Sequence, residues 1–488
     1  MFRGLKHSFR FFRVGWVLGR YDALYFFKKK RTSYSLLHFL IDVLTLLTPV
    51  KNEAKKLNEG ERLAKALQML GPAFIKLGQT FATRADVVGE DIAAELSVLQ
   101  DRLPSEPTEE IIEAIEAGLG AGIGEIFAHF EPKAVAAASI AQVHFATTPE
   151  GKEVAVKVLR PGIKERIFED INSFLWLAGV FEKYMKRSRR LKPTEVVKTM
   201  ARTIETELDL RMEAAAASEL KENMAGEPGY RVPDIDWSRT SKGVLTMERV
   251  KGTAINDIKK LKSKKWSTKD ISKTLVRVFL TQAMRDGFFH ADLHQGNFFV
   301  EDDGTLVPVD FGIMGRLDKP SRRFLAEILY GFHERNYERV AEVHFEAGYI
   351  PADQDRALFA QALRALVEPI MDKPLNQVSL GDMLSQLFKT TERFAMETQP
   401  QLIVLQRSMV MVEGLAMVID KDVNMWEVSR PVLERWARKL TGAEARISEL
   451  LSFLKDLFGL LPAFIAQLRE ILKVLGDYQP PDPAPKES

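Results

Sequence analysis

The side chains with the clearest chemical potential are three oxygen donors beyond the middle of the chain. Asp292 is followed five residues later by Asn297, and a predicted turn at Asp302–Gly304 leads on to Asp310 in a Val-Asp-Phe-Gly sequence. Carboxylate and amide oxygens suit Mg²⁺, and a neighbouring carboxylate can orient or deprotonate a nucleophile. The spacing therefore predicts that Asn297 and Asp310 hold Mg²⁺ at the phosphates of a nucleotide, while Asp292 acts on the nucleophile.

Two upstream features can contact the same phosphates. The strand-like run Val-Ala-Val-Lys ends at Lys157, whose ammonium group can neutralise phosphate charge. Before it lies a segment, here called the alanine loop, made of Ala136, Ala137, Ala138 and Ser139. Nucleotide-binding hairpins usually carry glycines at this position, and alanine restricts φ and adds methyl groups. We therefore expect the loop to approach the phosphates differently, which changes selectivity or rate rather than abolishing binding.

Lys157 needs an acidic partner that holds its side chain in place. The pattern from Thr194 to Met224 is helical and contains four candidate acids: Glu205, Glu207, Asp209 and Glu213. We expect Glu213 to pair with Lys157, and solvated surface charge is the alternative for all four. Glu207 and Asp209 are two residues apart, so they do not share a helix face.

Two strands are predicted at Gly229–Pro233 and Val244–Val250. They lead to a segment that we expect to link the two lobes of the fold. The linker is Met-Glu-Arg-Val, and its main chain is expected to contact the adenine through Glu248 and Val250.

Residues 58–100 predict two helices broken at Gly71-Pro72. The second carries Lys76 and Gln79 on one face, with Gly78 permitting close approach of another backbone, although an exposed polar face explains the same pattern. The run Gly118–Gly124 fits no phosphate-binding fingerprint and is predicted to end a helix.

Composition excludes several classes of site. The chain has 69 Lys and Arg against 67 Asp and Glu, a formal net charge of +2, and no cysteine. The charge balance indicates no nucleic-acid partner, and the absence of cysteine excludes disulfides and thiolate metal sites. The basic and aromatic N-terminus fits either an anionic membrane surface or the protein's own core. Leu36–Val50 is apolar but shorter than the roughly 20 residues that a spanning helix needs, so it is predicted to be a buried or interfacial helix.

Beyond Asp310 the pattern is helical almost to the end of the chain. The predicted helices are Arg322–Glu346, Asp353–Met371, Met383–Met396, Gln401–Val418 and Pro431–Leu440. The last segment, 446–488, is predicted to be an amphipathic helix followed by a disordered Pro-rich tail. This helix suits a membrane surface, a partner or its own domain.

These features together predict an α+β, two-lobed, protein-kinase-like fold. An N-terminal helical extension is expected to precede the two lobes, and the C-terminal lobe and tail are expected to be mostly helical. The predicted divisions are a membrane-proximal segment 1–57, a helical extension 58–125, an N-lobe 126–250, a C-lobe 251–445 and the terminal segment 446–488.

From about residue 58 to 440 the chain resembles the UbiB family of atypical kinase-like proteins. The resemblance lies in Lys76-Leu77-Gly78-Gln79, the alanine loop, Glu207-Leu208-Asp209 and the run His290–Asn297. It implies that the extension folds over the site where a protein substrate would bind. Lys76 and Gln79 would then reach the active site and meet Glu207 or Asp209 as regulatory residues.

The resemblance also implies a biological setting. The family is implicated in ubiquinone biosynthesis, shows ATPase rather than protein kinase activity, and associates with membranes and lipid-like precursors. We therefore expect ATP and Mg²⁺ as cofactors, at the cytoplasmic face of the bacterial inner membrane. Other ubiquinone-biosynthesis proteins and a second copy of the chain are candidate partners.

The chain departs from the family pattern in two places. Gln295 stands where the catalytic loop usually has Pro, which leaves Asp292 and Asn297 in register. Bacterial members often end in clear spanning helices, whereas this terminal segment is short and interrupted by charge. Peripheral and C-terminally anchored attachment therefore both remain open.

Three functions compete at this point. The leading interpretation is an ATPase or small-molecule kinase, with water or a lipid-like phenol as acceptor. The alternative is a nucleotide-sensing scaffold that organises biosynthetic enzymes or extracts lipid precursors with little turnover. A ring hydroxylase is disfavoured, because the chain has neither a dinucleotide fingerprint nor an evident two-His-one-carboxylate arrangement. His290 and His294 are instead expected to orient the catalytic loop.

Overall fold

The computed structural model describes residues 13–23, 48–82, 92, 95–96, 104–184, 192–264, 266–371, 386, 390, 393–396 and 399–441. They belong to two compact units. The first comprises Met1–Val278, Phe288–Gly315 and Pro400–Lys421, and the second comprises Phe279–Gly287, Arg316–Gln399 and Asp422–Ser488. Most of the predicted Leu36–Val50 and Met383–Met396 helices and all of 446–488 lie outside the described residues.

The first unit contains a five-stranded antiparallel sheet. Its strand order is β1-β3-β4-β5, and β2 pairs with the same strand, β3, as β1 does. The strands are β1 (His129–Phe130), β2 (Ala136–Ala137), β3 (Ala141–Thr147), β4 (Glu153–Leu159) and β5 (Val244–Glu248). The alanine loop thus begins on β2 and turns into β3.

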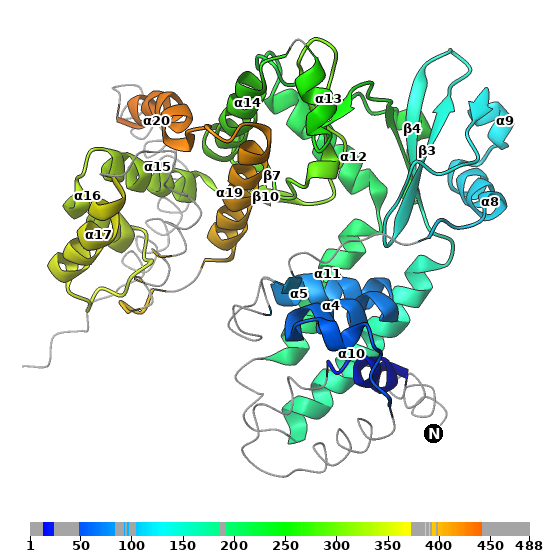
Figure 1. Cartoon of the computed structure of the whole chain (residues 1–488), viewed down its shortest axis with the longest axis horizontal. Helices are drawn as coiled ribbons and strands as arrows, with labels where there is room; N and C mark the ends of the chain where they lie inside the picture. Colours follow the sequence, from blue (N-terminus) through cyan, green and yellow to red (C-terminus); the bar gives the residue numbers. More distant parts are fainter. Residues whose placement is uncertain are drawn as a thin grey trace, which may run out of the picture. The chain divides into compact units, whose positions relative to one another are not determined.

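One face of this sheet is covered by α8 (Thr108–Leu119), beside which lies the short α9 (Ile123–Ile126) (Figure 1). Ile111 and Ile115 of α8 are fully buried against the alternate β4 residues Val154, Val156 and Val158. The predicted helix end in the glycine run is confirmed, because α8 stops at Leu119 and Gly120 has a left-handed φ of 77°.

The predicted helical pattern Thr194–Met224 forms two helices rather than one. They are α11 (Pro193–Glu207) and α12 (Leu210–Asn223). Asp209 leaves the helical backbone at φ −121° and ψ 93°, and its side chain accepts a hydrogen bond from the Arg211 amide. It therefore caps α12, which packs on β5 through Leu210 and Ala214.

Four of the described helices pack together around one hydrophobic core (Figure 1). Two of them come from the predicted extension 58–125, and the other two come from the predicted N-lobe 126–250. The predicted break at Gly71-Pro72 is confirmed, because α4 ends at Leu70 and Gly71 has a φ of 112°. Phe74 of α5 and Phe174 of α10 meet edge to face, with ring centroids 4.8 Å apart. The helices are α4 (Glu59–Leu70), α5 (Pro72–Ala82), α10 (Ile163–Tyr184) and α11, preceded by a 3₁₀ turn η1 (Ala54–Lys56).

The run His290–Asn297 and Asp310 lie among the short strands of two small sheets. β8 lies between β6 and β9 in a three-stranded sheet, and β10 pairs with β7. Their bounds are β6 (Thr253–Ala254), β7 (Phe288–His290), β8 (Phe298–Val300), β9 (Leu306–Pro308) and β10 (Met314–Arg316), and the 3₁₀ turn η5 (Gln295–Asn297) precedes β8.

The prediction of a strand at Gly229–Pro233 is wrong. Only an isolated bridge from Tyr230 to Leu306 forms there, because the partner strand pairs at this one position. Pro233 has no amide proton and cannot extend the pairing. The same unit contains the 3₁₀ turn η3 (Trp237–Arg239) and the helices α13 (Ile258–Ser263) and α14 (Thr268–Thr281).

α19 (Pro400–Ile419) confirms the predicted Gln401–Val418 helix. Among the described residues it is the one helix whose length and composition would allow it to cross a membrane, and half of its apolar stretch is buried inside the protein. Glu413 on this helix is buried, and the Ser272 hydroxyl donates to the Ala416 carbonyl at 3.0 Å. These contacts are typical of a core helix.

The described part of the second unit is helical. It contains a π-helical turn η4 (Gln282–Asp286), α15 (Lys319–His333), α16 (Tyr337–Glu346), α17 (Arg356–Met371) and α20 (Met425–Thr441). The predicted Arg322–Glu346 helix is divided, because Arg335 has a φ of 54° and Asn336 caps α16.

Candidate active site

The site is built around Lys157 on the central strand β4. Strand alternation buries Val156 and Val158 on one face and directs Lys157 to the other. Its Nζ donates to Glu213 Oε1 at 2.7 Å and Oε2 at 2.9 Å, and to Asp310 Oδ2 at 3.1 Å. Three residues far apart in the sequence therefore meet at one ammonium group.

Glu213 is presented by the first turn of α12, whose cap Asp209 fixes where the helix begins. Its side chain is 7% exposed, and Oε1 also accepts the Phe311 amide at 3.3 Å. The carboxylate thus contacts both Lys157 and the residue after Asp310. Of the four candidate acids, Glu213 is the one that the structure places on Lys157.

Burial and mutual electrostatic interactions determine the protonation states of Lys157, Glu213 and Asp310, here called the Lys157 cluster. Burial disfavours the charged form of Lys157, but Asp310 and Glu213 outweigh it and raise the pKa of the lysine. Burial also disfavours ionised Asp310, yet Lys157 and the Gly312 amide lower its pKa to about 2. For Glu213, burial is the largest effect and raises the pKa despite the lysine. Lys157 and Asp310 are therefore both charged at neutral pH.

His290 connects the two acidic positions of the catalytic sequence. The ring is buried, Nε2 lies 2.6 Å from the Asp310 carbonyl oxygen, and Nδ1 accepts the Asp292 amide at 3.2 Å. Because a carbonyl can only accept, Nε2 carries the proton and the imidazole is neutral. Burial lowers the pKa of His290, which favours the same state. His294 likewise accepts the Gly296 amide at Nδ1, 3.1 Å away, so both histidines orient the loop.

Asp292 and Asn297 are brought together by η5. The Asn297 Nδ2 lies 3.2 Å from the Asp292 carbonyl oxygen and 3.4 Å from its Oδ2. Burial, then Asp310, raise the pKa of Asp292, against the smaller effects of His290, His294 and Arg407. A raised pKa suits a group that accepts a proton. Arg407 could not be identified from local sequence, because it lies on α19, 115 residues after Asp292.

The donor set fits a magnesium ion. The Asn297 amide nitrogen faces Asp292, which leaves its oxygen available to a metal ion, and Asp310 supplies an ionised carboxylate. Among the described residues no group of three or more His, Asp or Glu side chains forms a metal site of its own. Mg²⁺ usually takes only one or two protein ligands and completes its shell with phosphates and water.

The alanine loop forms a tight turn above β3. Ala136 and Ala137 pair with Val143 and Gln142, and the Ala138 amide donates to the Ala141 carbonyl at 2.8 Å. None of the four loop residues has a positive φ, and Ser139 is fully buried. The turn therefore uses only backbone conformations that alanine adopts without strain.

The predicted base-contacting linker begins at the end of β5. The Glu248 amide donates to the Asp234 carbonyl at 2.8 Å, and the Arg249 amide to the Glu153 carbonyl at 3.1 Å. Val250 lies two residues beyond the strand. The strand before the linker is thus held from both sides.

Arg231 fixes this linker to the catalytic hairpin, a contact that sequence reasoning missed. Its guanidinium donates two hydrogen bonds to Glu248 at 2.9 Å each, and two to Glu301 at 2.6 and 2.7 Å. Glu248 ends β5, whereas Glu301 follows β8. One arginine therefore ties the linker to the β8–β9 hairpin that follows Asn297.

Of the predicted regulatory residues, Lys76 contacts Glu207, whereas Asp209 has another partner. Lys76 Nζ on α5 lies 2.7 Å from Glu207 Oε2 on α11, with side chains 11% and 13% exposed. Asp209 instead binds the Arg211 guanidinium, 2.6 Å from Nη2, while it caps α12. Gln79 lies on α5, one turn after Lys76, and is half-buried. The helix break between Glu207 and Asp209 explains why the two acids take different partners.

Comparison with protein families gives two matches. Residues 98–344 match the model described as ABC1 atypical kinase-like domain, and residues 363–424 match the UbiB helical domain. The first match contains every residue of the Lys157 cluster and the catalytic run.

Curated relatives match nearly the whole chain. One from Marinobacter nauticus, named "Probable protein kinase UbiB", is 40% identical over 96% of this chain and 84% of its own length. One of the same name from Pseudomonas putida is 38% identical over 97% of this chain and 88% of its own length.

Two solved structures are distantly similar. The Rv3197–erythromycin complex from Mycobacterium tuberculosis is 22% identical, with a TM-score of 0.49 over 81% of this chain and 98% of that one. The Rio2 kinase–ADP/Mg²⁺–phosphoaspartate complex from Chaetomium thermophilum is 12% identical, with a TM-score of 0.27 over 70% and 97%. The family matches carry the assignment of an α+β, kinase-like fold, as the sequence predicted.

Proposed function

Since the chain belongs to the UbiB family of atypical kinase-like proteins, we propose that it is an ATP-dependent enzyme that supports ubiquinone biosynthesis at a membrane. One observation carries the nucleotide part of this proposal. Lys157 is held by Glu213 and Asp310 within 3.1 Å, and His290 joins Asp310 to Asp292. This is the arrangement that ATP phosphates and a metal require.

Each residue has a definite role in the proposed reaction. Lys157 neutralises the α- and β-phosphates, and Asp310 with Asn297 would hold Mg²⁺. The metal, when bound, supplies positive charge beside the phosphates. Asp292 orients the nucleophile or accepts its proton, for which its raised pKa is suited. The main chain at Glu248 and Val250 contacts the adenine, and the alanine loop covers the phosphates.

The acceptor is water or a lipid-like phenol. In this proposal the helical extension folds over the groove where a protein substrate would otherwise bind, as the family resemblance implies. The ion pair of Lys76 with Glu207 holds α5 on α11 and so keeps the extension closed, with Gln79 on the same helix as Lys76. A closed groove favours ATP hydrolysis or small-molecule phosphorylation over phosphorylation of proteins.

The proposed location is the cytoplasmic face of the bacterial inner membrane. The basic and aromatic sequence of the N-terminal segment suits an anionic lipid surface, where lipid-like ubiquinone precursors are found. Attachment is peripheral or through the C-terminal segment, and other ubiquinone-biosynthesis proteins or a second copy are the expected partners.

The second candidate is a nucleotide-sensing scaffold with little turnover. The ion pair between Lys157 and Asp310 supports it, because Lys157 competes with a metal for Asp310. A protein that binds ATP tightly but hydrolyses it slowly would change conformation with nucleotide rather than consume it.

ATP turnover by the purified full chain separates the two candidates. It is measured with and without cardiolipin-containing vesicles and a phenolic precursor, for wild type and Asp292→Asn. Turnover that rises with the vesicles and falls in the variant supports the enzyme. Tight ATP binding without turnover under every condition supports the scaffold.

A further inference from the structure

The alanine loop is tethered by Arg160, whose guanidinium binds the loop itself. Arg160 follows β4 three residues after Lys157, and its side chain is 5% exposed. Its amide donates to the Ile140 carbonyl at 2.9 Å, and its Nε donates to the Ala138 carbonyl at 3.0 Å. One residue thus holds both sides of the turn through two carbonyl groups.

The other end of the guanidinium is anchored on Glu106. Arg160 Nη1 lies 2.9 Å from Glu106 Oε1, just before α8. The Glu106 amide donates to the Gln142 side-chain oxygen at 2.8 Å, and Gln142 is buried on β3. Glu106, which holds the guanidinium of Arg160, is therefore itself bonded to β3, the strand that follows the loop.

A buried histidine fixes the orientation of that glutamine. Gln142 Nε2 lies 2.8 Å from His144 Nε2, and His144 Nδ1 lies 2.9 Å from the Glu131 carbonyl oxygen. Because Gln142 accepts from Glu106 through its oxygen, its nitrogen donates to His144, so the imidazole is neutral with its proton on Nδ1. The polar chain from Glu131 to Arg160 has one consistent set of donors.

We propose that Arg160 is a positioning residue that holds the alanine loop at a fixed place relative to Lys157 for binding the phosphates of a nucleotide. The inference rests on the proposed nucleotide-binding function. Lys157 lies on β4 and Arg160 follows directly after its last residue, so the same strand positions both the lysine and the loop. Planar guanidinium geometry lets one side chain donate to a carbonyl and a carboxylate together, which lysine cannot reproduce.

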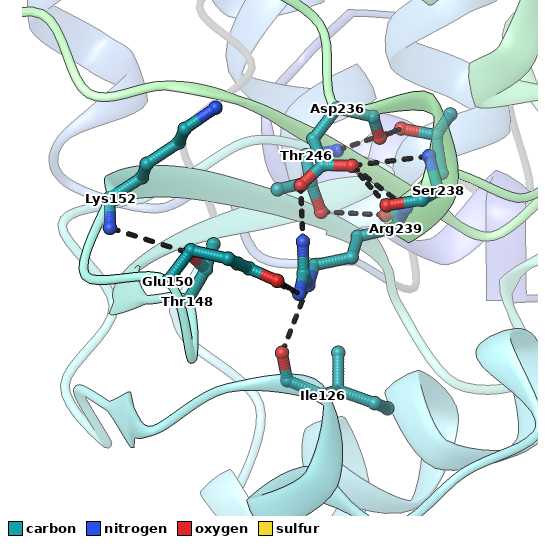
Figure 2. Close-up of polar contacts among 9 residues, drawn as sticks. Ile126, Thr148, Glu150, Lys152, Asp236, Ser238, Arg239 and Thr246 are labelled. Atoms are coloured by element: carbon teal, nitrogen blue, oxygen red, sulfur yellow. Dashed lines mark hydrogen bonds and ion pairs between the residues drawn. The ribbon is translucent and has the colours of Figure 1, made fainter.

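The same lobe provides a matched control. Like Arg160, Arg239 donates hydrogen bonds to a main-chain carbonyl and to carboxylates. Its Nε donates to the Ile126 carbonyl at 3.0 Å, its Nη1 to Asp236 at 2.7 Å and its Nη2 to Glu150 at 2.9 Å. Figure 2 shows this guanidinium among those groups, beside the turn that joins β3 to β4. That turn lies at the opposite end of the strands from the alanine loop.

The test compares ATP with adenosine, which lacks phosphates, by calorimetric titration of full-length wild type, Arg160→Ala, Arg160→Lys and Arg239→Ala. Arg160→Ala is expected to raise the Kd for ATP about tenfold, equivalent to about 1.4 kcal/mol, and to leave the Kd for adenosine unchanged. Arg160→Lys keeps an ion pair with Glu106 and should show the same selective loss, and it serves alone if the alanine variant does not fold. Arg239→Ala should change neither Kd.

A parallel loss of ATP and adenosine binding in the Arg160 variants would overturn the inference, as would unchanged ATP binding. Equal effects of Arg160→Ala and Arg239→Ala would also overturn it. A wild type that binds no ATP overturns the proposed function itself, whereas a wild type that binds ATP with Arg160 variants that bind it equally well overturns only the role of Arg160.

Discussion

Lys76 on α5 and Glu207 on α11 form an ion pair of 2.7 Å with side chains almost excluded from solvent. Replacing one partner removes the counter-charge from a group that is largely shielded from water, which costs up to about 3 kcal/mol. We expect Lys76→Met and Glu207→Gln each to lower the free energy of unfolding, and the double variant to be more stable than the sum of the two losses predicts. Chemical denaturation of all four proteins measures the coupling; additive losses would show that the pair is not formed.

Arg231 couples the linker that we propose to contact adenine to the β8–β9 hairpin. Arg231→Ala frees Glu248 and Glu301 from their shared guanidinium, so the linker loses its fixed position. We expect binding of ATP and of adenosine to weaken by the same factor, about threefold, because the base rather than the phosphates is affected. Titration of both ligands, with Arg239→Ala as control, checks this. A loss confined to ATP would contradict it.

Activity should decline on acidification through the raised pKa of Asp292. A base must be deprotonated to act, and burial followed by Asp310 raises the pKa of this carboxyl group. Arg407 opposes that rise, so Arg407→Ala should move the acid limb of the pH–rate profile to higher pH, whereas Arg407→Lys should keep it near the wild-type position. An acid limb that Arg407→Ala leaves in place would argue that Asp292 is not the titrating group.

Stability should also depend on pH through His344 in the second unit. Burial lowers the pKa of His344 from 6.5 to about 4, so the unfolded chain binds a proton more readily than the folded one. Stability from this group is complete above the unfolded pKa and is lost as pH falls from 6.5 toward 4; near pH 5 the loss is about 2 kcal/mol. Denaturation near pH 7 and near pH 5 measures it, and His344→Phe should reduce the difference. Equal pH dependence in the variant would exclude His344 as the cause.

Local spacing predicts the candidate site residues of the run His290–Asn297 and Asp310. Asp292, Asn297 and Asp310 lie in one short segment, and Lys157 lies in a strand with regular alternation, so each could be recognised from near neighbours. Glu213 was selected from four acids by its expected partner, and the structure places it there. The helix break at Asp209 was missed, although an Asp before a helical run is a preferred N-cap.

The contacts of Arg160, Arg231 and Arg407 could not be predicted in the same way. Each arginine acts on a residue in a different element, from 17 to 115 positions away. An arginine has the same sequence appearance whether its guanidinium is solvated or holds two carboxylates, and tertiary packing decides between these states. The false strand at Gly229–Pro233 has a related cause, because strand formation there depends on a partner that supplies only one bridge.

Metal-dependent ATP binding tests the central claim most directly. The Kd for ATP is measured with Mg²⁺ and with chelator for wild type, Asp310→Asn and Asp303→Asn, which removes the same charge from the turn of the β8–β9 hairpin. The account predicts that Mg²⁺ tightens ATP binding in wild type and Asp303→Asn, because the ionised Asp310 carboxylate is available as a metal ligand, and that this effect vanishes in Asp310→Asn. Tightening by Mg²⁺ that persists in Asp310→Asn, or no ATP binding by wild type, would contradict it.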